Sequence, residues 1–127
     1  NLDKAVEYVK RALKFEPDNG AYIDTLGWIY YRQSKYEDAV KEIEKANTLI
    51  SDDPTIKDHL GDVHDKIRNS DKATLFWTES FMLDPNNESV AEKLKTRGVD
   101  IKKLRKKALK SKHEPKPSDT PDEEETP

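Results

Sequence analysis

Residues 20–39 read GAYIDTLGWIYYRQSKYEDA, and the main features of this stretch recur 34 positions later in the chain. Leu26 and Gly27 recur as Leu60 and Gly61. Small, bulky and helix-breaking residues keep the same period, in the sets Ala5, Ala39 and Ala73; Ala12, Ala46 and Ser80; Val9, Ile43 and Trp77; and Pro17, Ser51 and Pro85. A fixed period of this length predicts a repeat protein, whose units stack to bury one continuous core.

The apolar residues within each unit have helical spacing. Leu26 and Ile29 share one face of a first helix, and Ala39 and Ile43 share one face of a second. The intervening stretches EPDNG, ISDDP and LDPNN carry turn and N-cap residues. Gly27 is small enough to let the two helix backbones approach closely. The sequence therefore predicts an all-α fold of antiparallel helix pairs.

This order of Leu-Gly, Ala, Ala or Ser, and Pro resembles the tetratricopeptide repeat (TPR) from residue 1 to about residue 97. The stretches DNGAYIDTLGWIYYR and DDPTIKDHLGDVHDK are also similar to the closing repeats of bacterial envelope-associated proteins of that family. The resemblance implies an α-α superhelix, a solenoid of antiparallel pairs with C-terminal capping helices. It also implies a location in the bacterial cell envelope or the cytoplasm.

Three residues depart from the family pattern. His64 stands where the family usually has Tyr, and Ser51 stands where it usually has Pro. Asn69 replaces the usual small turn residue, and we expect it to adopt the left-handed conformation. These departures predict that the second full repeat packs somewhat less well than the first.

The repeat predicts how the chain is divided. We expect a TPR array over residues 1–97 and a basic helix over residues 98–112. The tail over residues 113–127 is acidic and rich in Pro, and its composition predicts disorder. Within the array we expect a half repeat, two full repeats and a capping helix, at residues 1–20, 21–53, 54–86 and 87–97.

Composition limits the chemistry of the chain. Cysteine is absent, and charged residues (39%) outnumber the hydrophobic class (33%). No apolar run approaches the roughly 18 to 20 residues that a membrane span needs. The first residues, NLDKAVEYVK, have neither an initiator Met nor the apolar core of a signal peptide, so we expect a piece of a longer protein.

The stretch DHLGDVHDKI, residues 58–67, is rich in metal-binding residue types. His59 and His64 are five positions apart, however, which places them about 140° apart around a helix. Such a pair does not share a metal without ligands from elsewhere, so no metal site is predicted. We interpret His64 as an aromatic substitute that packs on the next helix with one ring nitrogen hydrogen-bonded.

Asp58, Asp62 and Asp65 fall on one helix face because their spacings are four and three. One interpretation is a solvated face, with Lys57 and Lys66 moderating the repulsion. The other is part of a ligand groove. In this family the first helices line the concave surface, so the resemblance implies the groove residues Asp24, Trp28, Tyr31, Arg32, Asp58, Asp62, Asp65 and Lys66.

The character of these residues indicates a ligand class. The family's carboxylate clamp has Lys and Asn where this chain has Asp24, Trp28, Asp58 and Asp62, so an acidic chaperone motif is not expected. An acidic groove with aromatic surface favours a peptide that carries Lys or Arg beside an apolar anchor. Trp28 could alternatively pack against the neighbouring helix, whereas the register of Trp77 predicts a core position.

Three functions remain open, and none is enzymatic. The sequence has no Gly-rich phosphate loop, no usable His pair and no serine on a nucleophile turn, and it predicts no cofactor. The first hypothesis is a protein-interaction module, and the second is a structural cap of a longer array whose groove lies upstream. The third is nucleic-acid or anionic-membrane contact through residues 102–112, chiefly Lys102, Lys103, Arg105, Lys106 and Lys107.

Overall fold

The computed structural model describes residues 1–113, which contain seven helices and no strand. The residues of the expected acidic tail beyond His113 lie outside this described part. The helices are α1 (Leu2–Phe15), α2 (Gly20–Arg32), α3 (Tyr36–Leu49), α4 (Pro54–Lys66), α5 (Ser70–Leu83), α6 (Glu88–Lys95) and α7 (Ile101–His113).

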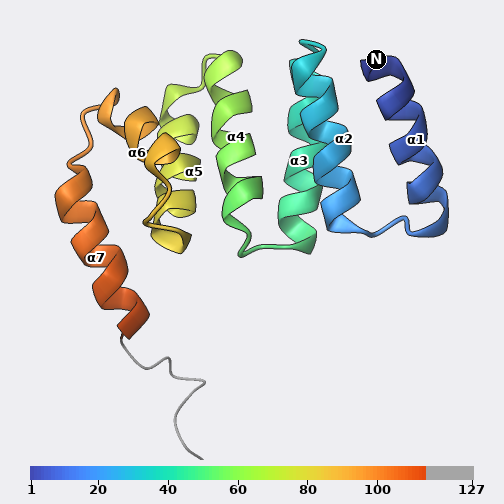
Figure 1. Cartoon of the computed structure of the whole chain (residues 1–127). Helices are drawn as coiled ribbons and strands as arrows, with labels where there is room; N and C mark the ends of the chain where they lie inside the picture. Colours follow the sequence, from blue (N-terminus) through green and yellow to red (C-terminus); the bar gives the residue numbers. More distant parts are fainter. Residues whose placement is uncertain (114–127) are drawn as a thin grey trace, which may run out of the picture.

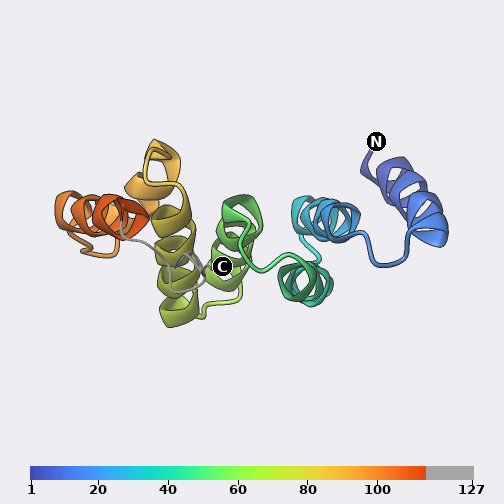
Figure 2. The ribbon, with the colours of Figure 1, turned by 90° about the horizontal axis from the view of Figure 1, so that it is seen from below.

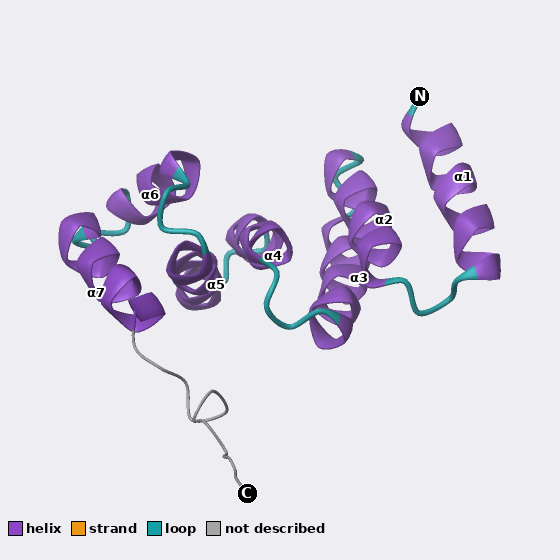
Figure 3. Cartoon of the chain, turned by 60° about the horizontal axis from the view of Figure 1, so that its bottom comes forward, coloured by secondary structure: helices purple, strands orange, loops and turns teal. Residues whose placement is uncertain are grey.

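The helices form an open array rather than a closed bundle. Figures 1 and 2 show them succeeding one another along the molecule from α1 to α7, and Figure 3 shows only helices and loops in the described part. The closest packing is within the pairs α2–α3 and α4–α5. These observations confirm the prediction of an all-α solenoid of antiparallel helix pairs.

One capping device starts α2, α4 and α6. The side chains of Asn19, Asp53 and Asn87, each 34 positions from the next, cap these three helices in turn. Each accepts a hydrogen bond from the backbone N–H three residues further on, at 3.0, 3.1 and 3.2 Å. Therefore α6 begins in register with α2 and α4 and corresponds to the first helix of a third repeat.

The turns inside the two full repeats use a left-handed residue. Ser34 and Arg68, one period apart, both have φ of 64°. The prediction that Asn69 takes this conformation is wrong, because Asn69 has φ of −100° and caps α5 with its side chain. A capping side chain requires a residue outside the helical region, so the left-handed position falls one residue earlier, on Arg68.

Glycine and large apolar side chains meet where paired helices cross. A Cβ placed on Gly27 would lie 2.4 Å from Ile43, and one on Gly61 would lie 2.3 Å from Trp77. Ile43 is fully buried and Trp77 is 3% exposed, which confirms the predicted core position of Trp77. The glycines thus let α2 and α4 pack tightly on α3 and α5.

The end helices differ in how they join the array. The apolar residues Val90, Ala91 and Leu94 of α6 are fully buried in a cluster with Trp77 and Phe81 of α5. Ile101 and Ala108 attach α7, whereas α1 contains no buried residue. None of the helices in residues 1–113 is both long and apolar enough to cross a bilayer.

Candidate functional site

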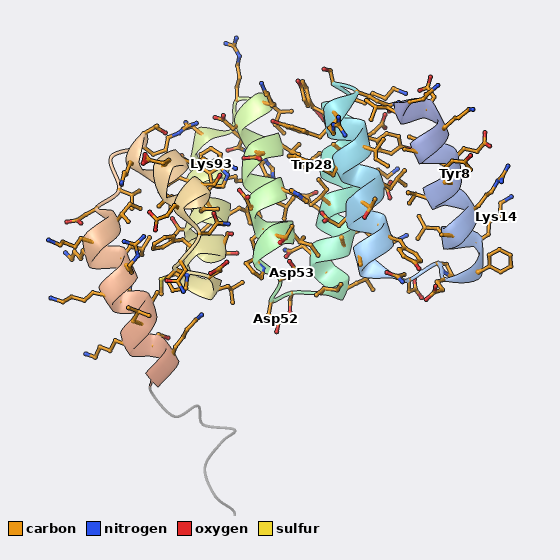
Figure 4. All side chains as sticks on the ribbon, in the orientation of Figure 1. Tyr8, Lys14, Trp28, Asp52, Asp53 and Lys93 are labelled. Carbon is orange, nitrogen blue, oxygen red and sulfur yellow. The ribbon has the colours of Figure 1, made fainter. Side chains whose placement is uncertain are left out.

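The predicted groove residues lie on two neighbouring first helices. Four are on α2 and four are on α4, and these helices contact each other directly. Figure 4 marks Trp28 on α2 and Lys93 on α6, on either side of α4. The contacts among these three helices decide which of the predicted residues remain open to a ligand.

Trp28 lies between two other rings. Its indole stacks on Tyr31 at 4.4 Å between ring centroids and on His59 of α4 at 4.1 Å. Tyr31 in turn meets the ring of Tyr36 edge-on at 5.6 Å. Trp28 therefore packs against the neighbouring helix and remains half-exposed, with its ring edge rather than either ring face open to a ligand.

The carboxylate of Asp24 is hydrogen-bonded within the protein. The Nδ1–H of His59 donates to its carboxylate, at 2.9 Å from Oδ1 and 3.0 Å from Oδ2, because a carboxylate can only accept. Asp24 is 8% exposed. This carboxylate links α2 to α4 rather than facing a ligand.

Lys93 makes the corresponding contact one repeat later. Its Nζ lies 2.8 Å from Oδ1 of Asp58 and 2.9 Å from Oδ1 of Asp62. Lys93 follows His59 by 34 positions, just as Asp58 follows Asp24. The same contact between successive first helices is thus used twice, first with an imidazole and then with an ammonium group.

The remaining carboxylate of the row is paired with Arg97. The guanidinium of Arg97 donates to Asp65, and it lies 5.1 Å above the ring of Trp77. The indole N–H of Trp77 donates to Oδ1 of Asp62 at 3.1 Å. These residues join α4 and α5 to the turn that follows α6.

The environment shifts the pKa values of this cluster. Burial raises the pKa of Asp62, and the hydrogen bond and charge of Lys93 oppose this rise without cancelling it. Burial also acts to lower the pKa of Lys93, but hydrogen bonds and charge from Asp58 and Asp62 outweigh it and leave that pKa raised. Both pKa values therefore shift upward for different reasons: burial prevails at Asp62, and the two neighbouring carboxylates prevail at Lys93.

The solvated-face interpretation of the three aspartates needs one correction. The repulsion among the three aspartates is moderated by Lys93 and Arg97 and not by Lys57, which pairs with Glu79 of α5 at 3.0 Å. Two cations of the chain therefore offset part of the charge of these three carboxylates. The repeat contains a signal for this contact, because Lys93 stands in register with His59. The capping interpretation of residues 87–97 does not use that signal.

Exposed cations and a hollow remain on this face. Arg32 and Lys66, one period apart, are both exposed and form no ion pair within residues 1–113. A hollow of about 320 Å³ lies between α4, α5 and α6, lined by Asp62, Asp65, Trp77, Glu92, Lys93, Thr96 and Arg97. This surface can hold a polar or mixed-charge chain, and residues 1–113 contain no cluster of three metal-ligating side chains.

His64 lies apart from the groove. It is 3% exposed and stacks on Phe76 of α5 with 5.5 Å between centroids, which confirms its predicted packing on the next helix. The predicted hydrogen bond is wrong, because neither ring nitrogen has a partner within residues 1–113. The Glu44 carboxylate is 3.8 Å from Nε2, and burial lowers the pKa of His64.

Comparisons with known proteins agree with this architecture. The tetratricopeptide repeat model matches residues 22–53. TPR repeat-containing protein PA4667 of Pseudomonas aeruginosa is 37% identical over 59 residues, which are 46% of this chain and 10% of that protein. BBSome complex member BBS4 of Bos taurus is 37% identical over 57 residues, 45% of this chain and 11% of that protein.

The match therefore spans about a tenth of the length of these curated relatives. Among solved structures, the crystal structure of MamA aligns over 87% of this chain and 88% of its own, with a TM-score of 0.46 and 18% identity.

Proposed function

Because residues 22–53 match the tetratricopeptide repeat model and the helices stack in antiparallel pairs, we propose that this chain is a non-catalytic protein-interaction module that holds a partner's peptide or helix across α2 and α4. Arrays of this kind act as scaffolds for other proteins, since stacked helix pairs present an extended concave surface. The proposal places the partner on the face that carries Trp28, Tyr31, Arg32 and Lys66.

The observation that carries the proposal is the stack of Trp28 between Tyr31 and His59. Stacking fixes all three rings before a ligand arrives, so little side-chain entropy is lost on binding. Aromatic side chains and arginine dominate the energy of protein interfaces. The edge of Trp28 and the adjacent Arg32 thus supply an apolar and a charged contact on α2.

The charge of the ligand follows from which side chains are already paired. The expected preference for a basic partner loses support, because Asp58 and Asp62 hold Lys93 and Asp65 holds Arg97. Arg32 and Lys66 are the exposed charges that remain on this face. We propose a partner segment with an apolar anchor for Trp28 and an acidic group within reach of these two cations.

The test is a peptide selection followed by a charge reversal. Peptides selected from a random library on the whole chain are measured by fluorescence anisotropy against Arg32→Glu with Lys66→Glu. The matched control is Lys10→Glu with Lys41→Glu, which makes the same charge change on exposed positions of α1 and α3.

We expect selected peptides to bind the groove variant roughly tenfold or more weakly, and to bind the control like the original chain. Peptide-induced changes in the amide NMR spectrum should fall on α2 and α4. Equal binding to all three proteins, or amide changes confined to other helices, would contradict the proposal.

A second function is supported by α1. Ala5, Val9 and Ala12 are only half-buried, although Ile43 and the other residues one period later are fully buried under α2. This uncovered apolar face suits a structural cap of a longer array with its groove elsewhere. In that case library selection should yield no peptide whose binding depends on Arg32 and Lys66.

A further inference from the structure

The outer face of α7 carries five lysines that take no part in packing. Ile101 and Ala108 attach the helix to the rest of the array, at 6% and 0% exposure. At about 100° per residue, the lysines span an arc of about 140° away from that buried stripe. All five are exposed: Lys102, Lys103, Lys106, Lys107 and Lys110, here called the lysine face.

Two other basic residues of α7 serve the fold. Arg105 donates to the carbonyl oxygen of Pro85 at 3.0 Å and to Glu88 at 2.7 Å. Lys112 donates to the carbonyl oxygen of Leu83 at 2.7 Å. These contacts tie α7 to the end of α5 and the start of α6, so they position the lysine face at the end of the array (Figure 1).

The lysine face itself is not neutralised by the array. None of its five side chains pairs with a carboxylate of residues 1–113. Lys102, Lys106 and Lys110 follow one another at four-residue spacing, an arrangement in which the like charges repel one another along one helix face. A bound anion would remove this repulsion.

Two hollows of about 250 Å³ each lie at the start of the lysine face. One is lined by Asp100, Lys102, Lys103 and Lys106. The other adds the aliphatic side chains of Val99 and Leu104 to Asp100, Lys103 and Lys107. Asp100 accepts a hydrogen bond from the backbone N–H of Lys103 at 3.1 Å, so its carboxylate is engaged as a helix cap.

We propose that the lysine face binds an acidic segment of a partner protein, with carboxylates on the lysines and an aliphatic side chain against Val99 and Leu104. Lysine attracts carboxylates as a point charge, and the hollow beside Lys103 offers an apolar floor within reach of two ammonium groups. This surface lies on α7, outside the proposed groove on α2 and α4, and its function does not depend on that groove.

The composition of the face favours a peptide over other anions. Nucleic-acid surfaces add aromatic rings for base stacking or arginine forks for phosphates, but this face has no ring and Arg105 is held by Glu88 and Pro85. Insertion into a membrane interface needs a broad apolar face, whereas Leu109, at 45% exposure, is the one exposed leucine of α7.

The experiment titrates the full chain with a short labelled peptide in which Glu and Asp alternate with Leu. The test variants replace Lys102, Lys106 and Lys110 together, by Glu in one protein and by Gln in a second. The Gln variant relieves repulsion, so it should keep the fold. The matched control carries Lys4→Glu, Lys10→Glu and Lys14→Glu on exposed positions of α1.

We expect peptide binding to weaken roughly ten- to a hundredfold in both test variants and to stay unchanged in the control. A peptide with Ser in place of Leu should bind more weakly than the original. The proposal is overturned by equal weakening in the control, by no difference between the Leu and Ser peptides, or by no peptide binding. Tighter binding of a DNA duplex, or of phosphatidylserine vesicles, through the same lysines would also overturn it.

Discussion

The Nζ of Lys93 lies 2.8 Å from Oδ1 of Asp58, and this contact joins α6 to α4. One repeat earlier His59 and Asp24 join α4 to α2 in the same way. In a solenoid each unit contacts only its neighbours, so the interfaces between units determine how cooperatively the array unfolds. The acidic residues of the first helices are therefore structural links as well as surface charges.

Replacing Lys93 should weaken the end of the array. In Lys93→Met, Asp58 and Asp62 lose their shared cation and face each other as like charges on one helix. Because these side chains are about a fifth exposed, solvent screening limits the cost to about 1 to 2 kcal/mol. Urea denaturation measures this change in unfolding free energy.

The matched control is Lys95→Met on the same helix. Lys95 is 51% exposed and pairs with Glu92 at 3.5 Å, so its loss should cost less than about 0.5 kcal/mol. Equal costs for the two variants would show that the Lys93 contacts contribute no more than a surface charge.

The glycines should differ in their tolerance of a methyl group. In Gly61→Ala the new Cβ would lie 2.3 Å from the buried ring of Trp77, which cannot move without disturbing the core. We expect a loss of about 1 to 3 kcal/mol, or more, in unfolding free energy. In Gly20→Ala the Cβ meets the flexible side chain of Ile50 at 2.7 Å, so the loss should be smaller. Thermal unfolding of both variants tests this, and a reversed order would refute the packing argument.

The fold could be predicted from the sequence because the 34-residue period places equivalent residues at equivalent helix crossings. Leu26 with Gly27, and Leu60 with Gly61, mark the crossings where Ile43 and Trp77 are buried. The third unit keeps the same register but is harder to recognise in the sequence, because Leu94 is followed by Lys95 instead of glycine. Its first helix, α6, ends at Lys95 and is eight residues long against thirteen in α2 and α4.

The contacts of the site were harder to foresee for a physical reason. Helical periodicity places Asp58, Asp62 and Asp65 on one face, but it does not give what the next helix brings to that face. Lys93 and Arg97 reach this face because α6 and the turn after it pack beside α4, a contact that the periodicity of α4 does not contain. Whether the eight groove residues hold a ligand stays a prediction.

Glycine should be favoured at the left-handed turn residues. Arg68 has φ of 64°, a conformation that costs a residue with a Cβ about 1 to 2 kcal/mol. Part of this gain is offset because glycine also makes the unfolded chain more flexible, so Arg68→Gly should stabilise the protein by about 0.5 to 1 kcal/mol. Ser34→Gly, one repeat earlier, should act in the same direction. Chemical denaturation measures both, and destabilisation of both variants would contradict the backbone argument.

The pH dependence of stability should depend on His64. Burial lowers its pKa below the ordinary value of 6.5, with Glu44 opposing and Lys72 reinforcing the shift. As pH falls below 6.5 the unfolded chain takes up a proton that the folded protein resists, so the unfolding free energy falls until the pH passes the lowered pKa.

His64→Phe removes this contribution and keeps a ring against Phe76. It also removes two buried nitrogens that lack partners, so the variant should be about 1 kcal/mol or more stable near neutral pH. Urea denaturation of both proteins between about pH 7 and pH 5 should show their difference growing as the pH falls. A difference that stays constant over this range would mean that His64 is protonated as readily in the folded protein as in the unfolded chain.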